Sequence, residues 1–300
     1  MSLRLVKEIL QTTPTLEGAG VKLQRAFGFG KTAEFDPFLL FDDFRNENPA
    51  DYIKGFPWHP HRGIETITYV LAGTVEHGDS LGNRGEMSAG DVQWMTAGSG
   101  ILHQEMPKGD AHGRMHGFQL WANLPRAHKM TDPRYQDIPA SAIPEVTDDD
   151  GTHVRIISGE FWGKRGPVEG VAADPNYIDV SVAPGKRKRL KVETTRNAFA
   201  YVFAGAGTFR DASAPQAVLT EAAADPHAAP VYDATNHSLV LFDRGDEITV
   251  QAGPEGIRFL LVSGKPIEEP VAWHGPIVMN TQEEIRQALA ELHTGGFIRR

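Results

Sequence analysis

The stretch that decides the fold runs from residue 59 to residue 73 and reads HPHRGIETITYVLAG. Its second part, Ile64 to Leu71, is rich in β-branched residues and ends at the turn residue Gly73, which predicts a strand. Its first part, His59-Pro60-His61, places two imidazoles at positions i and i+2. Residues two apart on an extended strand point to the same face. We therefore expect a β-structure that carries two histidines on one face.

A second string, His103-Gln104-Glu105, has the same spacing and follows a turn-rich stretch and the apolar Ile101-Leu102. If the two strings lie on neighbouring strands of a small β-barrel, three imidazoles and one carboxylate converge inside it. Such groups are costly to bury unless they are paired or coordinate an ion, and their chemistry suits a divalent transition metal. We expect a mononuclear metal site at His59, His61, His103 and Glu105. A structural histidine cluster is the alternative, because the chain has 12 histidines.

The composition limits the class of protein. With 300 residues, 40% of them hydrophobic, the chain is long enough for two domains with cores of their own. Its 31 glycines and 20 prolines among short Val, Ile, Thr and Phe runs suit a mostly β chain with many turns. The absence of cysteine excludes disulfides, thiolate metal sites and thiol nucleophiles. A net charge of −9 disfavours direct nucleic-acid binding.

Targeting signals give a weaker indication. Residues 1 to 10 carry Arg4, Lys7 and Glu8 and no apolar core of signal-peptide length. No apolar stretch of the sequence is long enough to cross a membrane. We expect a cytoplasmic protein that does not contact a membrane.

Two short motifs recur in the same order along the chain. YVLAG at 69–73 returns as YVFAG at 201–205, and GD at 90–91 followed by TAG at 96–98 is echoed by GD at 245–246 followed by QAG at 251–253. The chain is therefore expected to contain two copies of one β-barrel domain. The expected boundaries are 1–139 for a metal-binding domain and 152–300 for a degenerate one, with a linker at 140–151 that contains an acidic run.

Aligning the two copies tests whether the second also binds metal. Lys191 and Glu193 fall opposite His59 and His61. The residues opposite His103 and Glu105 are, depending on one residue of slip, Arg258 or Phe259 and Leu260 or Leu261. The proposed ligands do not repeat, so a second metal site is not expected and the fold itself does not require the first.

The remaining elements follow from hydrophobic patterns. Strands are expected around residues 38–42, 64–71, 92–95, 100–105, 117–121, 154–158, 178–182, 198–203, 238–242, 248–252 and 257–262. One helix is expected at about 281–293, where Thr281 and Glu284 make a capping box ahead of an apolar stripe. We expect this helix to pack against a barrel.

Longer blocks resemble a known family. HPHRG and its flanks fit the first cupin motif, and the segment that ends at His103 fits the second, both with altered spacing. The blocks DPFLLFDDF (36–44), FPWHPHRGIET (56–66), QWMTAGSGILHQEM (93–106) and QLWANLP (119–125) resemble the pirins more specifically. In the second half the resemblance rests mainly on GPIVMNT at 275–281.

The resemblance implies a bicupin, that is, two tandem cupin-type β-barrels with a short C-terminal helix. It implies iron held in the N-terminal barrel by His59, His61, His103 and Glu105, and an empty C-terminal barrel. Many cupins place a carboxylate ligand where this chain has Glu65, but the pirin pattern uses the later carboxylate. We therefore expect Glu65 to be structural or to contact a ligand rather than the metal.

The chemistry of the predicted site leaves three classes of function. Three imidazoles and one carboxylate leave two open positions on a six-coordinate Fe(II), Mn, Ni or Zn ion. The resemblance implies a quercetin 2,3-dioxygenase that binds a flavonol-like aromatic substrate and O2, with Glu105 as general base and carbon monoxide released. A second class, which the resemblance to the pirins also implies, is an iron- and redox-dependent regulatory protein that binds a transcription factor or a metabolic enzyme. A zinc-type hydrolase or isomerase ranks last, and a monomer is expected.

Overall fold

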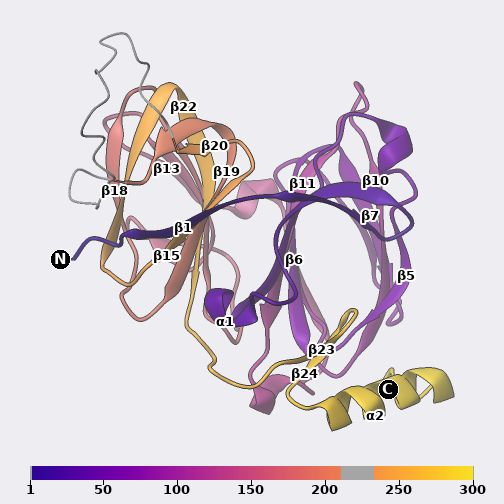
Figure 1. The fold of residues 1–300 in the computed structure, drawn as a ribbon. Coiled ribbons are helices and arrows are strands. Elements are labelled where there is room, and N and C mark those ends of the chain that lie inside the picture. Colours follow the sequence, from indigo (N-terminus) through magenta and orange to yellow (C-terminus); the bar gives the residue numbers. More distant parts are fainter. Residues whose placement is uncertain (1, 211–232, 300) are drawn as a thin grey trace, which may run out of the picture. The chain divides into compact units, whose positions relative to one another are not determined.

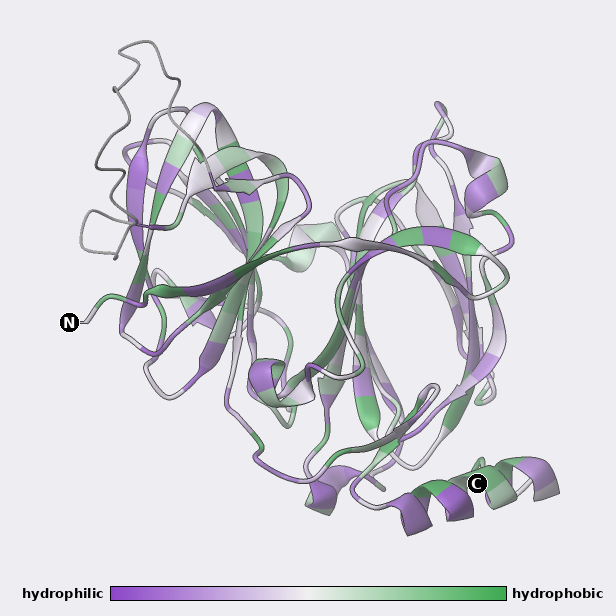
Figure 2. Cartoon of the chain, viewed as in Figure 1, coloured by the Kyte–Doolittle hydropathy of each residue, from purple (hydrophilic) through white to green (hydrophobic). Residues whose placement is uncertain are grey.

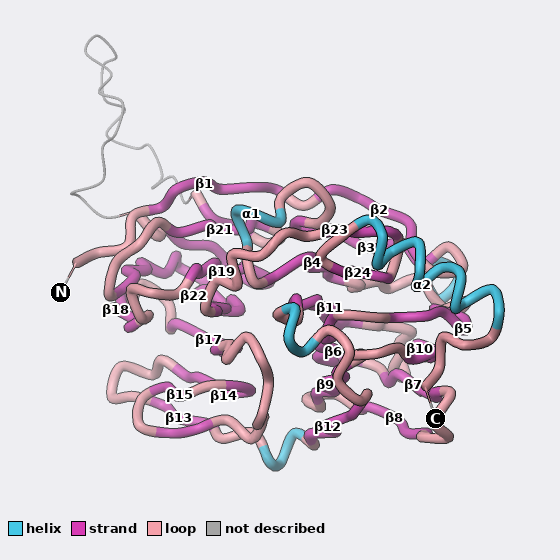
Figure 3. The backbone as a smooth tube through the Cα atoms, turned by 90° about the horizontal axis from the view of Figure 1, so that it is seen from below, coloured by secondary structure: helices cyan, strands magenta, loops and turns pink. Residues whose placement is uncertain are grey.

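The computed structural model describes residues 2–210 and 233–299, and over these residues the chain is mostly β (Figures 1 and 3). It contains two compact units. The histidine unit consists of residues 12–144, 156–176 and 264–300, and the companion unit of residues 1–11, 145–155 and 177–263. No helix in the described ranges is long and apolar enough to span a bilayer.

Two sheets form the barrel of the histidine unit. The larger has seven strands in the order β12-β9-β6-β11-β4-β3-β2, with bounds β2 Thr13–Glu17, β3 Val21–Phe27, β4 Phe38–Asp43, β6 Ile64–Ala72, β9 Val92–Thr96, β11 His116–Asn123 and β12 Arg134–Ile138. The smaller has the order β5-β10-β7-β8, with bounds β5 Phe56–His61, β7 Thr74–Asp79, β8 Arg84–Met87 and β10 Ile101–Lys108. Figure 1 shows β5 and β7 across the barrel from β6. The two predicted ligand strings therefore lie on the smaller sheet.

Short elements complete this unit. They are α1 Thr32–Phe35, 3-10 turns at Pro49–Asp51, Arg126–His128 and Ala140–Ala142, and the hairpins β15 Glu160–Phe161 with β16 Lys164–Arg165 and β23 Ala272–His274 with β24 Ile277–Met279. The expected C-terminal helix is α2, Gln282–Thr294. Its capping box is present: Thr281 Oγ1 accepts from the Glu284 amide, and the Thr281 amide donates to Glu284 Oε2 at 2.8 Å. Gly295 ends the helix in the left-handed conformation at φ 80°.

The companion unit holds a nine-stranded sheet. Its strands are β1 Val6–Gln11, β13 Glu145–Thr147, β14 His153–Ser158, β17 Asn176–Val182, β18 Arg187–Lys191, β19 Asn197–Thr208, β20 Ala234–Thr235, β21 Ser238–Phe242 and β22 Glu247–Gly264. The two strands expected at 248–252 and 257–262 form the single strand β22. Aromatic side chains pack in this unit, where the Phe209 ring lies 5.6 Å from that of Phe242 and 5.1 Å from that of Phe259.

The compact units differ from the expected division at 1–139 and 152–300. The first eleven residues belong to the companion unit, because β1 pairs antiparallel with β21. Residues 264–300 belong to the histidine unit, because Val278 on β24 is buried in one cluster with Ile64 and Ile101. Strand pairing and apolar burial therefore decide the membership of both terminal segments, whatever their position along the chain.

The hydropathy of the strands reflects the faces to which their side chains point. Figure 2 shows hydrophobic and hydrophilic residues interspersed along the strands, as expected when successive side chains of a strand point to opposite faces. The central strand β6 is an exception, because its first seven residues are all buried. Both faces of β6 are therefore covered by protein, and polar side chains on it, such as Thr68, are buried.

Candidate metal centre

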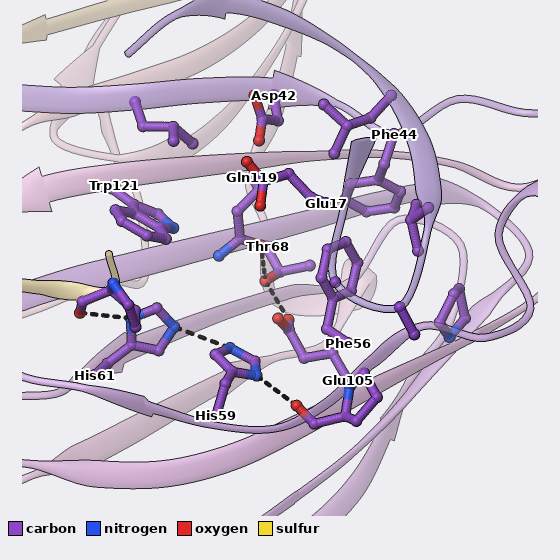
Figure 4. Close-up of a pocket in the computed structure, with 18 of the residues that line it drawn as sticks. Glu17, Asp42, Phe44, Phe56, His59, His61, Thr68, Glu105, Gln119 and Trp121 are labelled. Atoms are coloured by element: carbon purple, nitrogen blue, oxygen red, sulfur yellow. Dashed lines mark hydrogen bonds between the residues drawn. The ribbon is translucent and has the colours of Figure 1, made fainter. Parts of the chain in front are cut away.

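Three imidazoles meet at one end of the histidine unit. Strands β5 and β10 pair antiparallel with His103 directly opposite His59, so the prediction that the two strings lie on neighbouring strands is confirmed. One ring nitrogen from each of His59, His61 and His103 lies within 4.8 Å of the other two. His61 and His103 are buried, and His59 is half-buried. Figure 4 shows His59 and His61 side by side at the wall of a cavity.

The hydrogen bonds of two rings fix which nitrogens face the centre. His59 Nδ1 lies 2.9 Å from the Pro57 carbonyl oxygen, and His61 Nδ1 lies 3.2 Å from that of Pro276. A carbonyl only accepts, so each Nδ1 carries the proton and each Nε2 of the neutral ring presents a lone pair. These two Nε2 atoms are 3.1 Å apart. Two facing lone pairs repel unless a cation binds both, and nitrogens bound about 2.1 Å from one ion at right angles lie about 3 Å apart.

The third ring and the protonation states also fit a metal. Neither ring nitrogen of His103 has a hydrogen-bond partner among the described residues, although the ring is buried. Burial holds the pKa of His61 and of His103 well below 6.5 and lowers that of His59. Neutral imidazole is the form that binds metal, and an unpartnered buried nitrogen is costly unless an ion takes it. The residues present therefore suit a divalent transition metal.

Glu105 stands beside this group of three. It is on β10 two residues after His103, but the pairing shifts at this point, and Glu105 lies opposite Phe56. Thr68 Oγ1 is 3.0 Å from Glu105 Oε1. Burial raises the pKa of Glu105 to about 7, and the Thr68 hydrogen bond partly opposes this. The carboxylate lines the same cavity as His59 and His61 but is outside the group whose ligand atoms lie within 4.8 Å of one another.

Glu65 is held elsewhere. It lies on β6 at odd spacing from Thr68, so its side chain points to the opposite face of the sheet. Thr96 Oγ1 donates to Glu65 Oε1 at 2.8 Å, and the carboxyl group is buried there. The expectation that Glu65 does not bind the metal agrees with this position.

A cavity of about 690 Å³ opens beside the histidines, within the range of small-molecule sites. Aromatic rings lead from the centre outward: the Trp121 ring lies 5.1 Å from that of His61 and 6.0 Å from that of Trp273, which in turn lies 5.3 Å from that of Phe29. Phe29 is 77% exposed, and so marks the mouth of the cavity. The sequence left open whether Phe41, Trp94 and Phe118 face the metal, and none of them lines this cavity.

The C-terminal segment positions the centre from outside the barrel. The turn between β23 and β24 supplies the Pro276 carbonyl that orients His61. Arg62, which follows His61 in the sequence, is fully buried. Its guanidinium donates to the carbonyl oxygens of Ser99 at 2.6 Å and Phe297 at 3.0 Å, and it pairs with the Glu291 carboxylate at 2.7 Å. Sequence reasoning missed the contacts with Pro276, Glu291 and Phe297, because no local pattern links residues more than 200 positions apart.

A second buried cation ties the same segment down. Lys129 Nζ donates to the carbonyls of Gly63 at 2.8 Å and Val278 at 3.0 Å and to Asn123 Oδ1 at 2.5 Å. Burial lowers the pKa of Lys129 to about 7. Together with Arg62, it fixes the loop that follows His61 against β24.

Comparison with known proteins places this arrangement. A mostly β chain with two cupin domains in tandem is a bicupin. The family model described as Pirin matches residues 20–122, and the one described as Pirin C-terminal cupin domain matches residues 177–298. The chain therefore belongs to the pirin family.

Relatives match along nearly the whole chain. A pirin-like protein of Caulobacter vibrioides is 42% identical over 298 residues, covering 99% of this chain and 100% of that protein. Human pirin is 39% identical over 277 residues, covering 92% of this chain and 87% of its own length. Among solved structures, one described as quercetin 2,3-dioxygenase from Acinetobacter baumannii has a TM-score of 0.85 and 30% identity, with 98% of each chain covered.

Proposed function

We propose that this chain is a metal-dependent flavonol 2,3-dioxygenase, acting on quercetin or a similar flavonol. His59, His61, His103 and Glu105 would hold one divalent transition metal, with Fe(II) favoured and Mn, Ni or Zn as alternatives. When bound, the metal supplies open positions that bring an oxygen-chelating substrate and O2 together. The reaction opens the heterocycle and releases carbon monoxide.

One observation carries the proposal: the Nε2 atoms of His59 and His61 lie 3.1 Å apart at the wall of a cavity that is also lined by aromatic rings. A planar phenolic ligand suits such walls, because Trp121 and Trp273 offer rings against which it can stack. Two further observations support it. The cavity has a size typical of small-molecule sites, and the Acinetobacter relative carries the name of this activity.

The residues of the chain have distinct tasks in this reaction. Glu105 would accept the proton of the flavonol 3-hydroxyl once its own bond to the metal loosens, because it is a buried carboxylate inside the cavity. Thr68 holds one of its oxygens at 3.0 Å and so fixes the direction of the other. The carbonyls of Pro57 and Pro276 keep the His59 and His61 rings turned toward the centre.

The test is simultaneous measurement of quercetin loss and oxygen uptake. It compares the iron-loaded chain, the metal-free chain and His103→Ala, with His128→Ala as a control, because His128 is an exposed histidine of the same unit. We expect equal loss of quercetin and O2 for the iron-loaded chain and for His128→Ala. The rates of quercetin loss and oxygen uptake should be at least about 100-fold lower for the metal-free protein and for His103→Ala.

Two other outcomes would overturn the proposal. Quercetin loss without oxygen uptake would favour a hydrolase or isomerase, in which bound water attacks. No turnover by protein with one equivalent of bound iron would favour the regulatory alternative. The next experiment would then compare the binding of protein partners to the Fe(II) form and to the Fe(III) form.

A further inference from the structure

A polar row crosses the larger sheet of the histidine unit. Each strand from β12 to β3 contributes one polar residue directly opposite that of the next strand: Asp137, Gln93, Thr68, Gln119, Asp42 and Arg25. Residues directly opposite each other on paired strands point to the same face. The last four line the cavity.

Most neighbours of the cavity-lining part of this row are apolar. Leu40 lies two positions before Asp42, and Trp121 lies two positions after Gln119. Phe44 and Val70 lie on the other side of the row, two positions after Asp42 and Thr68. Burying polar groups between such rows is costly unless each finds a partner. Asp42 is 4% exposed and Thr68 is 3% exposed. The polar groups of the row therefore need hydrogen-bond partners, either inside the barrel or on a ligand.

One end of the row is a fixed ion pair. Arg25 Nε and Nη2 donate to the two oxygens of Asp42 at 2.8 and 2.7 Å, and Arg25 Nη2 also lies 2.8 Å from Glu17 Oε1. Burial raises the pKa of Asp42 to about 6, which leaves the carboxylate ionised at neutral pH. A carboxylate offers about four acceptor positions, and Arg25 takes two. Asp42 therefore retains acceptor capacity at the cavity wall.

The middle of the row orients a second acceptor. Thr68 Oγ1 lies 3.0 Å from Glu105 Oε1 and 2.7 Å from the Gln119 amide oxygen. A hydroxyl has one proton and can donate to only one of these two oxygens, so when it donates to Glu105 the amide of Gln119 turns its nitrogen toward Thr68. This turn directs the amide oxygen of Gln119 away from Thr68. Figure 4 shows Thr68 and Gln119 between Glu105 and Asp42.

We propose that Asp42 and Gln119 are a recognition subsite for hydroxyl groups on the part of the substrate farthest from the metal. This rests on the proposed function. The ligand class is a planar phenol with a chelating oxygen pair at the histidines and at least one hydroxyl on its distal ring. Hydrogen bonds from such hydroxyls to Asp42 satisfy its remaining lone pairs, and a ring without hydroxyls leaves them buried and unpaired. Sites of this kind discriminate strongly against the analogue that lacks the hydroxyl.

The experiment measures dissociation constants by quenching of tryptophan fluorescence, since Trp121 and Trp273 line the cavity. The protein carries one equivalent of Zn²⁺, which does not consume the ligand. The probes are quercetin, with two hydroxyls on its distal ring, and galangin, with none. Wild type should bind quercetin about 10- to 100-fold more tightly than galangin, as expected for a hydrogen bond to a charged group.

Two variants test the residues. In Asp42→Asn the amide oxygen faces Arg25, so the NH2 group replaces an acceptor at the cavity wall, and the quercetin preference should fall to within about threefold. Gln119→Met removes the second acceptor at similar volume and should reduce the preference to a lesser degree. The control is Asp179→Asn, which breaks a similar fork with Arg258 in the companion unit. It should keep the wild-type ratio.

The outcomes separate this inference from the proposed function. Equal affinity of wild type for the two flavonols, or an unchanged ratio in Asp42→Asn, would overturn the subsite even if quercetin is turned over. Failure of both flavonols to bind would overturn both proposals. A selective subsite in a protein whose iron form consumes no oxygen would leave the subsite standing and remove the dioxygenase.

Discussion

Both units contain an arginine that forks onto a buried aspartate, but the surroundings of the two pairs differ. Arg25 and Asp42 line the large cavity of the histidine unit. In the companion unit, the Arg258 guanidinium pairs with Asp179 and lies 5.0 Å above the ring of Phe203. The pair of the histidine unit thus lines a cavity of about 690 Å³, whereas in the companion unit Arg258 covers an aromatic ring and lines a smaller cavity of about 270 Å³. The three clustered histidines belong to the unit with the larger cavity.

The largest expected effect is on the free energy of unfolding, and it compares the aromatic packing of the companion unit with the histidine cluster of the other unit. Phe259→Ala removes a ring packed against Phe209 and should lower the free energy of unfolding by about 3 to 5 kcal/mol. His103→Ala removes a buried, unpartnered imidazole and should change it by less than about 1 kcal/mol in metal-free protein. Urea unfolding of both variants checks this. A loss from His103→Ala as large as that from Phe259→Ala would make the histidine cluster structural.

The second effect concerns pH and the hollow unit. The pKa of Asp42 is about 6 in the folded chain and 3.8 in the unfolded one. Between these values the folded state binds the extra proton, so the Asp42 contribution to stability is present at low pH and falls as pH rises through this window. The change amounts to about 3 kcal/mol. Asp42→Asn should lose this dependence, and unfolding curves of variant and wild type at pH 4 to 7 that run parallel would contradict the raised pKa.

A smaller effect tests whether the buried pair between Arg62 and Glu291 of α2 holds the histidine centre in place. Glu291→Gln weakens the pair with buried Arg62 and should cost about 1 to 2 kcal/mol and lower metal affinity about threefold to tenfold, because the turn that orients His61 loosens. Calorimetric titration with Zn²⁺ measures the affinity. The control is Glu283→Gln on the same helix, whose pair with Arg286 is exposed and should contribute less than about 0.5 kcal/mol. Equal losses of stability and of Zn²⁺ affinity in the two variants would contradict a role of the Arg62–Glu291 pair in holding this turn.

The smallest effect should stay within α2. Thr281→Ala deletes the N-cap and should cost about 1 kcal/mol. Hydrogen exchange should rise in the first turn of α2, while amides of the companion unit keep wild-type rates. Thr294→Ala, at the other end of the helix and exposed, serves as the control. Faster exchange in the companion unit would show that the two units are not independent in stability.

The sequence predicted the mostly β fold, the C-terminal helix and the pairing of the two ligand strings, because each has a local signal: alternation, a capping box and i, i+2 spacing. It did not predict which compact unit holds β1 or α2, since pairing with β21 or packing through Val278 depends on long-range contacts. Strand register was equally unreadable, and a slip of one residue reverses the face of every side chain. For this reason Gln119 and Trp121, rather than Phe118, face the cavity.

The polar row was invisible for a related reason. Its members occur once per strand, and in the sequence no local pattern distinguishes them from the other polar residues of the same strands. They become neighbours only when six strands are set in register. The position of Glu105 beside the histidine group likewise reflects an irregularity in the pairing of β10 with β5, which the i, i+2 spacing alone does not reveal.

The contact between His61 and the Pro276 carbonyl also sets the order in which the centre can be completed during synthesis. All three histidines leave the ribosome long before residue 276, and every strand of the companion sheet except β1 is made in between. A nascent chain at that stage holds the imidazoles without the carbonyl that fixes the His61 tautomer. The His61 ring therefore takes its final orientation only in the last part of translation, after the strands of both units have been made.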